Sequence, residues 1–343
     1  MIRTVTGISF KNLQNIVTEF GGKKFYAKQI WKWIYQRSVT DFDRMTDLPL
    51  DLRSTLGSYF TPDKITVREI RKSFDGTEKL LLELSDGIYI ECVVIPEKNR
   101  LTLCVSSQAG CRFNCSFCAT GRMGFIRDLT SSEIVSQVLT ASNHTRRRIT
   151  NVVFMGMGEP FDNYDQVLRA ADIISDDSGL GIGKRKITIS SFGHIEGIRK
   201  YIEEDIRYKL AISLHNPFDD QRSRIMPVNK KYPVKELFDI LKIYTEKSNR
   251  KVIFEYVLIK GVNDSKEHAA ELMKRLKRMP CKLNLIRYHK CPDELDLDPP
   301  DKNSEFNFMA KLKDAPFPVV FRKSRGEDIS GACGQLAGGK INR

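Results

Sequence analysis

Three cysteines lie within eight residues of one another in the segment LTLCVSSQAGCRFNCSFCATG. Cys111, Cys115 and Cys118 have the spacing Cys-x3-Cys-x2-Cys, and closely spaced cysteine thiolates are the usual ligands of iron–sulfur clusters. Three such ligands would leave one iron of a 4Fe–4S cluster open to a small chelating molecule. The alternatives are ordinary loop thiols or a structural zinc site, but zinc normally takes four ligands from paired motifs. No second pair follows and the nearest histidine is His144, so the spacing favours a cluster.

A further cysteine lies near the end of the chain, in the segment RKSRGEDISGACGQLAGG. Cys333 is flanked by Ala332 and Gly334, and small neighbours suit an exposed loop whose thiol could reach a reaction centre. The alternative is that Cys333 is a small buried hydrophobic residue, as many free cysteines are. Glu91 also has two interpretations, because a single carboxylate in a predicted strand is ordinarily solvent-facing or ion-paired.

The composition indicates a globular protein with an affinity for polyanions. Of 343 residues, 41% are hydrophobic and 29% charged, and the formal net charge is +13. This excess favours nucleic acid as a partner, with an anionic membrane surface as the second choice. No apolar run approaches the roughly 20 residues of a membrane helix, and the amino-terminal segment lacks the features of a signal peptide. We therefore expect a cytoplasmic protein outside membranes, whose eight cysteines are thiols or cluster ligands rather than a disulfide framework.

Residues 1–60 are expected to form a helical accessory domain that binds RNA. Apolar residues recur at helical spacing over 10–20, 25–37 and 50–59. Trp31 and Ile34 are expected to pack in its core. A basic outer face suited to RNA phosphates would come from Lys23, Lys24, Lys28, Lys32 and Arg37.

Residues 61–98 are expected to be a small antiparallel β extension. Apolar and polar residues alternate with a period of two, and Asp75-Gly76 and Asp86-Gly87 are typical hairpin turns. The extension would lead directly into the segment that carries the three cysteines.

Predicted strands and helices alternate through residues 99–343, which implies parallel strands joined by crossover helices, as an open sheet or a barrel. Polar residues recur at the carboxyl ends of these strands, where parallel α/β folds build their active sites. The predicted strands are 102–106, 149–155, 186–191, 208–215, 251–259, 281–289 and 318–324, and the predicted helices are 131–142, 163–176, 194–204, 233–247, 265–278 and 303–313.

Four motifs in one order give the chain a resemblance to a known family. The three cysteines, GMGEP at 156–160, SLH at 213–215 and ACGQLAG at 332–338 resemble the RlmN/Cfr family of radical S-adenosylmethionine (SAM) RNA methyltransferases. FYAKQIWKWIY and RKSRG are closer to the RlmN members. The resemblance implies an α/β fold with a partial (β/α)6-type barrel, a 4Fe–4S cluster and SAM. It also implies methylation of carbon 2 of adenosine in 23S rRNA, with tRNA beside the anticodon as a second candidate substrate. A flavodoxin-type electron donor and a monomeric state are expected with it.

The resemblance also assigns roles to single residues. Cys111, Cys115 and Cys118 match the cluster ligands, and Cys333 matches the cysteine that carries the methyl group. Cys104 matches the thiol that forms a disulfide with Cys333 to release the base. Glu91 matches a carboxylate proposed as proton acceptor in that release. The residues that match SAM contacts are Gly158, Glu159, Ser190, Ser213, Leu214, His215 and His289.

The sequence departs from the family pattern at two places. At His289 the family usually has asparagine, and Ser330-Gly331-Ala332 stand where an acid and two alanines are commoner. Three remaining cysteines have no counterpart role and are interpreted as structural: Cys92, Cys281 and Cys291. Two other functions remain open at this point. One is Cfr-like methylation at carbon 8, and the other is a non-catalytic RNA-binding protein stabilised by a metal.

Overall fold

Three helices form the amino-terminal part of the chain. In the computed structural model, which describes residues 4–61, 65–290 and 296–337, these are α1 (Phe10–Glu19), α2 (Lys24–Arg37) and α3 (Leu50–Tyr59). The Ser9 side chain accepts a hydrogen bond from the backbone N–H of Asn12, which satisfies a free donor in the first turn of α1. The three predicted helices are confirmed.

The interior of this helical unit combines aliphatic and aromatic side chains, and its outer face carries the predicted cations. Trp31 and Ile34 are fully buried, and the ring of Phe10 meets Trp31 edge-on with centroids 5.3 Å apart. The unit contacts the rest of the chain where Ser131 Oγ donates to the Gly7 carbonyl over 2.9 Å. The predicted cations are all exposed, namely Lys23, Lys24, Lys28, Lys32 and Arg37.

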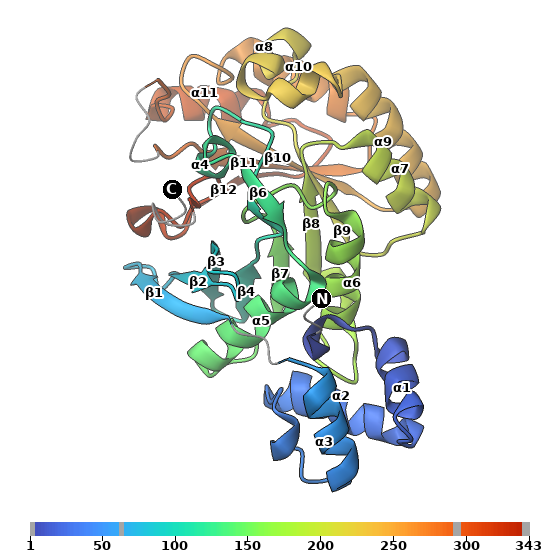
Figure 1. The fold of residues 1–343 in the computed structure, drawn as a ribbon. Helices are drawn as coiled ribbons and strands as arrows, with labels where there is room; N and C mark the ends of the chain where they lie inside the picture. Colours follow the sequence, from blue (N-terminus) through green and yellow to red (C-terminus); the bar gives the residue numbers. More distant parts are fainter. Residues whose placement is uncertain (1–3, 62–64, 291–295, 338–343) are drawn as a thin grey trace.

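One continuous sheet runs through the rest of the described chain, in the order β1-β2-β3-β4-β7-β8-β9-β10-β11-β12 (Figure 1). Strands β1 to β4 pair antiparallel, and the neighbours from β4 to β12 pair parallel. The strands are β1 (Thr66–Lys72), β2 (Glu78–Glu83), β3 (Tyr89–Glu97), β4 (Arg100–Cys104), β7 (Asn151–Phe154), β8 (Ile187–Ser191), β9 (Lys209–Ser213), β10 (Val252–Leu258), β11 (Cys281–Arg287) and β12 (Val319–Arg322).

The antiparallel strands form the edge of this sheet rather than a layer of their own. Val93 of β3 pairs with Cys104 of β4, so the extension is hydrogen-bonded directly to the first parallel strand. The predicted hairpin turns are present, and Gly76 and Gly87 have φ angles of 84° and 81°, which favour glycine.

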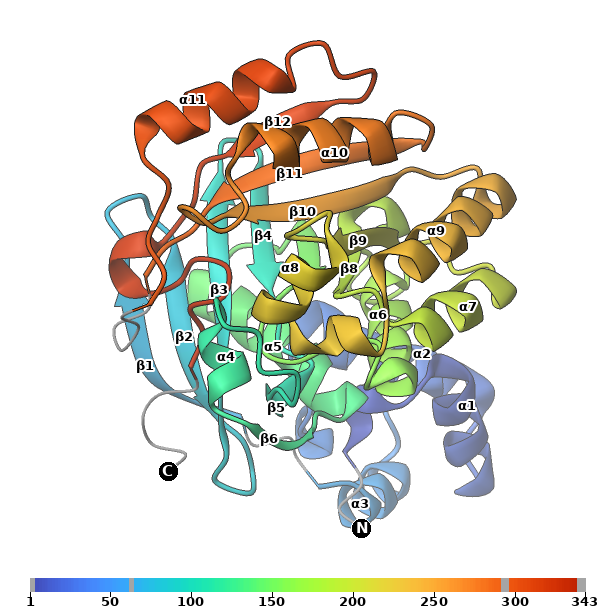
Figure 2. The ribbon, with the colours of Figure 1, turned by 90° about the horizontal axis from the view of Figure 1, so that it is seen from above.

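Helices cover the outside of the curved parallel sheet in an arc (Figure 2). The α/β architecture and its partial barrel are therefore confirmed, and β12 adds a parallel strand beyond β11. Helix α5 begins with a capping box between Thr130 and Glu133. The helices are α5 (Ser131–Thr145), α6 (Tyr164–Ser175), α7 (Ile195–Glu203), α9 (Val234–Ser248), α10 (Lys266–Leu276) and α11 (Lys302–Lys311).

Several elements of three to seven residues were outside the prediction, because such short segments display neither a helical nor a strand period. These include β5 (Gln108–Gly110) and β6 (Phe125–Asp128), an antiparallel pair that brackets the three cysteines. The others are α4 (Ala119–Arg122), α8 (Asp219–Ile225) and the 3-10 helices η1 (Val5–Gly7), η2 (Phe42–Arg44), η3 (Lys184–Lys186), η4 (Pro227–Lys230) and η5 (Glu327–Ile329). Within the described ranges, no helix is both long and apolar enough to cross a lipid bilayer.

Candidate active site

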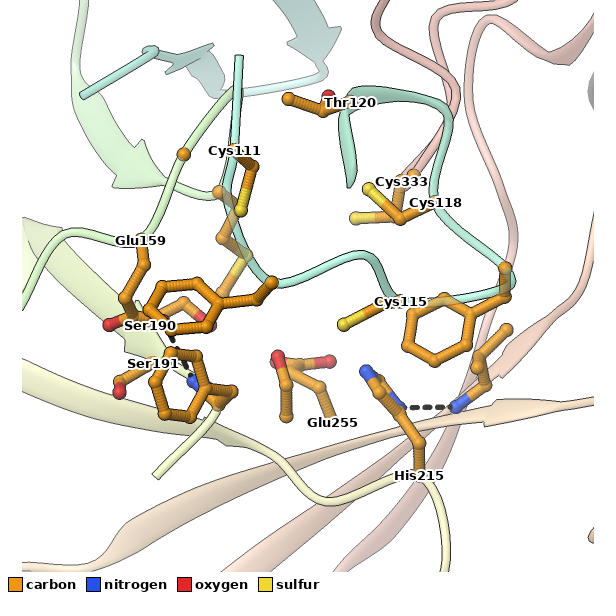
Figure 3. A pocket seen from close by; sticks show the side chains of 18 of the residues that line it. Cys111, Cys115, Cys118, Thr120, Glu159, Ser190, Ser191, His215, Glu255 and Cys333 are labelled. Carbon is orange, nitrogen blue, oxygen red and sulfur yellow. Dashed lines mark hydrogen bonds between the residues drawn. The ribbon is translucent and has the colours of Figure 1, made fainter. Parts of the chain in front are cut away.

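A cavity lies at the carboxyl ends of the parallel strands, as the sequence predicts for this type of sheet (Figure 3). Its wall comes from the loops after β7, β8 and β9, from β10 and β11, and from two further segments. These are the cysteine loop, residues 111–118, and the C-terminal loop, residues 326–337. The predicted site residues that line it are Cys111, Cys115, Cys118, Gly158, Glu159, Ser190, Ser213, His215 and Cys333.

Backbone hydrogen bonds hold the cysteine loop in place. The N–H of Cys111 donates to the Gly124 carbonyl over 2.9 Å, and that of Ser116 donates to the Ile225 carbonyl over 2.9 Å. Gly110 has φ 78°, and a Cβ there would lie 1.9 Å from the Gly124 oxygen, so the close pairing of β5 and β6 needs glycine. The loop therefore presents its three sulfur atoms toward one cavity (Figure 3).

The three loop thiols lie in surroundings that disfavour their ionised, thiolate form. Burial raises the pKa of Cys111 to about 12, and it also raises the pKa values of Cys115 and Cys118. Neighbouring cysteines add to the increase at Cys111 and Cys115. A cationic group bound to all three would remove both penalties. No three His, Cys, Asp or Glu side chains within the described residues are grouped as ligands of a single metal ion.

Gly158 and Glu159 shape the turn after β7. Gly158 has φ 94°, and a Cβ there would lie 2.4 Å from Cβ of Gln108, so this approach requires glycine. The Glu159 carboxylate accepts hydrogen bonds from the N–H groups of Phe161 and Phe192, each over 3.0 Å. Burial raises the pKa of Glu159 to about 7. Glu159 therefore ties the loop after β7 to the loop after β8.

His215 presents a hydrogen-bond donor to the cavity. Its Nδ1 accepts a hydrogen bond from the N–H of Val257 over 3.0 Å, and burial lowers its pKa to about 3. The neutral ring must therefore carry its proton on Nε2, on the side that faces the cysteine loop (Figure 3). Asn263 fixes the backbone by donating to the His215 carbonyl over 2.6 Å.

Two charged residues at this site were not predicted. Glu255 of β10 projects its carboxylate into the cavity, where Nδ2 of Asn284 donates to it over 2.8 Å (Figure 3). Burial raises the pKa of Glu255. A carboxylate inside the apolar run KVIFEYVLI was a signal that could have identified it.

Arg222 is the second charged residue that was not predicted, and it is fully buried outside the cavity lining. Its guanidinium donates to the carbonyls of Leu214 over 2.9 Å, Phe192 over 2.6 Å and Ser213 over 3.1 Å, and to Oδ1 of Asn229 over 2.7 Å. Burial lowers its pKa to about 10. Leu214 lies outside the cavity lining, with its backbone fixed by Arg222. In the sequence this arginine looks like any helical surface cation.

Of the two outer cysteines, Cys333 lies in the cavity lining and Cys104 lies outside it. Cys333 is exposed to the cavity beside Cys118 (Figure 3), which excludes its interpretation as a buried hydrophobic residue. Crowding by surrounding atoms still raises the pKa of its thiol to about 12. Cys104 is buried at the end of β4, and its pKa is raised mainly by burial and further by Cys333. Both are free thiols.

Glu91 and His289 lie behind the C-terminal loop rather than in the cavity lining. Glu91 is buried and paired with Lys79, so the ion-paired interpretation of its carboxylate is confirmed. His289 contacts Oγ of Ser324 over 2.6 Å and Glu327 over 2.8 Å, so both of its ring nitrogens have protein partners. Cys92 and Cys281 are buried, and Cys291 is outside the described residues.

Comparison with known proteins finds similar sequences and a similar structure that match nearly the whole chain. Residues 105–273 match the radical SAM superfamily, and residues 4–61 match the ribosomal RNA large subunit methyltransferase N-terminal domain. A Bacteroides fragilis protein named "Probable dual-specificity RNA methyltransferase RlmN" is 44% identical over 335 residues, covering 97% of this chain and 96% of its own. A protein of the same name from Staphylococcus aureus strain JH9 is 43% identical, covering 97% and 92%. A crystal structure of a radical SAM methyltransferase from Sphaerobacter thermophilus matches with TM-score 0.93 at 39% identity, covering 98% and 99%.

Replacing Arg222 by methionine should destabilise the fold. The change takes a donor from the carbonyls of Phe192 and Ser213, from the Asn229 amide oxygen, and from the Leu214 carbonyl, which keeps only the N–H of Asn216. A buried acceptor left without a donor costs about 1–3 kcal/mol. Denaturant unfolding measures the loss. Arg224→Met on the same helix is the control, because Arg224 is exposed and its loss should change the free energy of unfolding by less than about 0.5 kcal/mol. Equal unfolding midpoints for the two variants would contradict the role given to Arg222.

Proposed function

The chain belongs to the RlmN-type radical SAM methyltransferases, and we propose that it methylates carbon 2 of an adenosine in 23S rRNA by way of a methyl group carried on Cys333. An adenosine beside the anticodon of tRNA is the second proposed substrate, in keeping with the dual specificity in the names of the relatives. The observation that carries the proposal is that the thiol of Cys333 lies in the same cavity as the three cysteines of the loop. The net charge of +13 and the exposed lysines of α2 suit an RNA partner.

The donor set of the cavity fits the cofactors that this family uses. Cys111, Cys115 and Cys118 would hold three irons of a 4Fe–4S cluster, and the fourth iron would be open to SAM. The cluster and SAM together supply reductive cleavage of SAM to methionine and a deoxyadenosyl radical. The Nε2–H of His215 and the hydroxyls of Ser190 and Ser213 offer polar contacts for SAM in the lining.

Adenine carbon 2 is electrophilic, so it cannot attack the methyl group of SAM as a nucleophile. A carrier thiol solves this, because the Cys333 thiolate can take a methyl group from SAM by ordinary displacement. Loss of a hydrogen atom from that methyl group gives a carbon radical that adds to carbon 2. The RNA is then tethered to Cys333 through a methylene bridge.

Release of the product needs a second thiol and a base. The radical adduct would first lose one electron to the redox centre that the cluster supplies, and Glu91 would accept the proton of carbon 2. The Cys104 thiolate would then attack the sulfur of Cys333, forming a disulfide and breaking the carbon–sulfur bond, and the released methylene carbon would take up a proton to become the methyl group. The Cys104–Cys333 disulfide must be reduced before the next turnover, which suits the reducing cytosol. Within the same proposal, the protein acts there as a monomer and a flavodoxin-type protein supplies its electrons.

Iron and sulfide analysis tests the cofactor assignment. Protein reconstituted without oxygen should contain about four irons and four sulfides per chain, because a 4Fe–4S cluster is held by these thiolates. A variant with Cys111, Cys115 and Cys118 all changed to alanine should lose both. Stoichiometric zinc with no sulfide would instead favour the metal-stabilised RNA-binding protein.

Changing either of the two outer thiols should stop the reaction at a different stage. Cys333→Ala should abolish methylation, because no carrier remains. Cys104→Ala should accumulate protein covalently bound to RNA, because the bridge forms and cannot be cleaved. Gel electrophoresis of RNA–protein adducts and mass spectrometry of digested RNA report both results.

Cys281→Ala is the control for these variants, because Cys281 is buried in β11 and has no role in the proposal. It should form product without an adduct. Isomer standards in the same digest distinguish methylation at carbon 2 from methylation at carbon 8, and an 8-methyl product would make the enzyme Cfr-like. Methylated RNA from the Cys333→Ala variant would rule out the carrier.

A further inference from the structure

A buried ion pair lies in the antiparallel part of the sheet, behind the C-terminal loop. Nζ of Lys79 in β2 lies 3.1 Å from Oε1 of Glu91 in β3, and the two side chains are only 6% and 5% exposed. Two charges are rarely removed from water in this way, because the desolvation penalty can exceed their attraction. Such a pair needs further hydrogen bonds to offset this penalty. The segment to which those bonds are made indicates the role of the pair.

Both members of the pair reach the C-terminal loop, one on each side of Cys333. Nζ of Lys79 donates to the carbonyl of Ser330 over 3.1 Å. The N–H of Ala337 donates to Oε2 of Glu91 over 2.8 Å. Cys333 lies between Ser330 and Ala337 in the chain, so the two contacts fix both ends of the short segment that carries its thiol.

The same segment is held on its opposite side by the residues that follow the cysteine loop. The N–H of Ala119 donates to the Gly334 carbonyl over 2.7 Å, and Oγ1 of Thr120 donates to the Leu336 carbonyl over 2.6 Å. The segment that carries Cys333 is thus hydrogen-bonded both to the ion pair and to the end of the cysteine loop. Without the ion pair, the segment would keep these two contacts and the hydrogen bond that Nε2 of Gln335 donates to the Lys290 carbonyl over 3.1 Å, but it would lose the contacts at its two ends.

We propose that Lys79 is a positioning residue that, through its ion pair with Glu91, holds the C-terminal loop so that the thiol of Cys333 faces the cavity. The proposal gives Glu91 a second task beside proton transfer, since the same carboxylate holds the loop through Ala337. It rests on the proposed function only in taking Cys333 as the carrier. The placement of the loop can be measured without any RNA.

An ion pair between the neighbouring strands β1 and β2 provides a matched control. Nζ of Lys72 lies 3.1 Å from Oε1 of Glu78, the same separation as in the buried pair, but the Lys72 side chain is 70% exposed. No hydrogen bond from Lys72 to the C-terminal loop is present among the described residues. Lys72→Met therefore removes a lysine and an ion pair from the same antiparallel strands without releasing the loop.

The first measurement is the rate at which N-ethylmaleimide alkylates Cys333 in the reconstituted enzyme without RNA, followed by peptide mass spectrometry. Lys79→Met should raise this rate by about tenfold or more, because a loop freed at one side samples positions in which the thiol lies outside the cavity. Lys79→Arg should restore most of the wild-type rate, because arginine can also donate to Glu91 and to the Ser330 carbonyl. Lys72→Met should match the wild type.

The second measurement separates positioning from a general loss of stability. Lys79→Met should lower kcat for RNA methylation on the order of 100-fold, the scale for misplacing a reacting group by about 1 Å, with KM for RNA little changed. Methylation of Cys333 by SAM, assayed by mass spectrometry without RNA, should fall in parallel. If the wild type never acquires a methyl group on Cys333, the proposed function fails, whereas the alkylation rates still test the loop.

A second variant releases the loop without leaving Glu91 unpaired. Ala337→Pro removes the N–H that donates to Glu91 and keeps the lysine, so it should reproduce the altered alkylation even if Lys79→Met folds poorly. Wild-type alkylation and kcat in both Lys79→Met and Ala337→Pro would overturn the proposal. So would a lower unfolding midpoint in Lys79→Met with unchanged alkylation and kcat, because that result assigns the pair to stability alone.

Discussion

The contact between the end of the cysteine loop and the C-terminal loop is the interaction on which the candidate site depends. Thr120 and Leu336 are hydrogen-bonded across 216 residues of chain, and Ala119 is bonded to Gly334 beside them. A thiol at position 333 is useful only if it lies next to the cavity that the three cysteines line. The parallel sheet makes this contact possible, because it brings the ends of β7 to β11 to one edge and leaves β12 to lead the chain back.

The site is also unusual in the number of charged groups that it buries. Arg222, Glu159 and Glu255 are all nearly inaccessible to solvent, as are Lys79 and Glu91. Each makes hydrogen bonds to backbone or side-chain groups on other segments, so their desolvation is offset by bonds that define positions. Hydrophobic residues of similar size could fill the same volume but could not hold the carbonyls of three loops at fixed distances. We interpret these charges as fixing geometry at some expense of stability.

The outline of the fold and the composition of the site could be predicted because their signals are local. Strand and helix periods, the Asp-Gly turns and the spacing of Cys111, Cys115 and Cys118 are each contained in a few neighbouring residues. Lys79, Arg222 and Glu255 could not be found in this way, because what distinguishes them is a partner far along the chain. His289 illustrates the reverse case. Its family position implies a SAM contact, whereas both ring nitrogens here hold the segment that leads to Cys333.

The antiparallel strands contribute to the site by holding Glu91 at a fixed position. Continuous pairing of β3 with β4 makes Glu91 part of the same sheet as Cys104, so the carboxylate and the proposed resolving thiol keep a constant separation. The C-terminal loop, by contrast, is held by hydrogen bonds and by the contact of Glu327 with His289. Those bonds can break and re-form without disturbing the sheet. In the proposed reaction Cys333 would meet SAM, an adenine and Cys104 in turn, which requires a loop that is accurately placed but not permanently fixed. Of the elements around the cavity, the sheet would then supply the constant positions, and the C-terminal loop, which is tied to it by separate hydrogen bonds, would supply the movement.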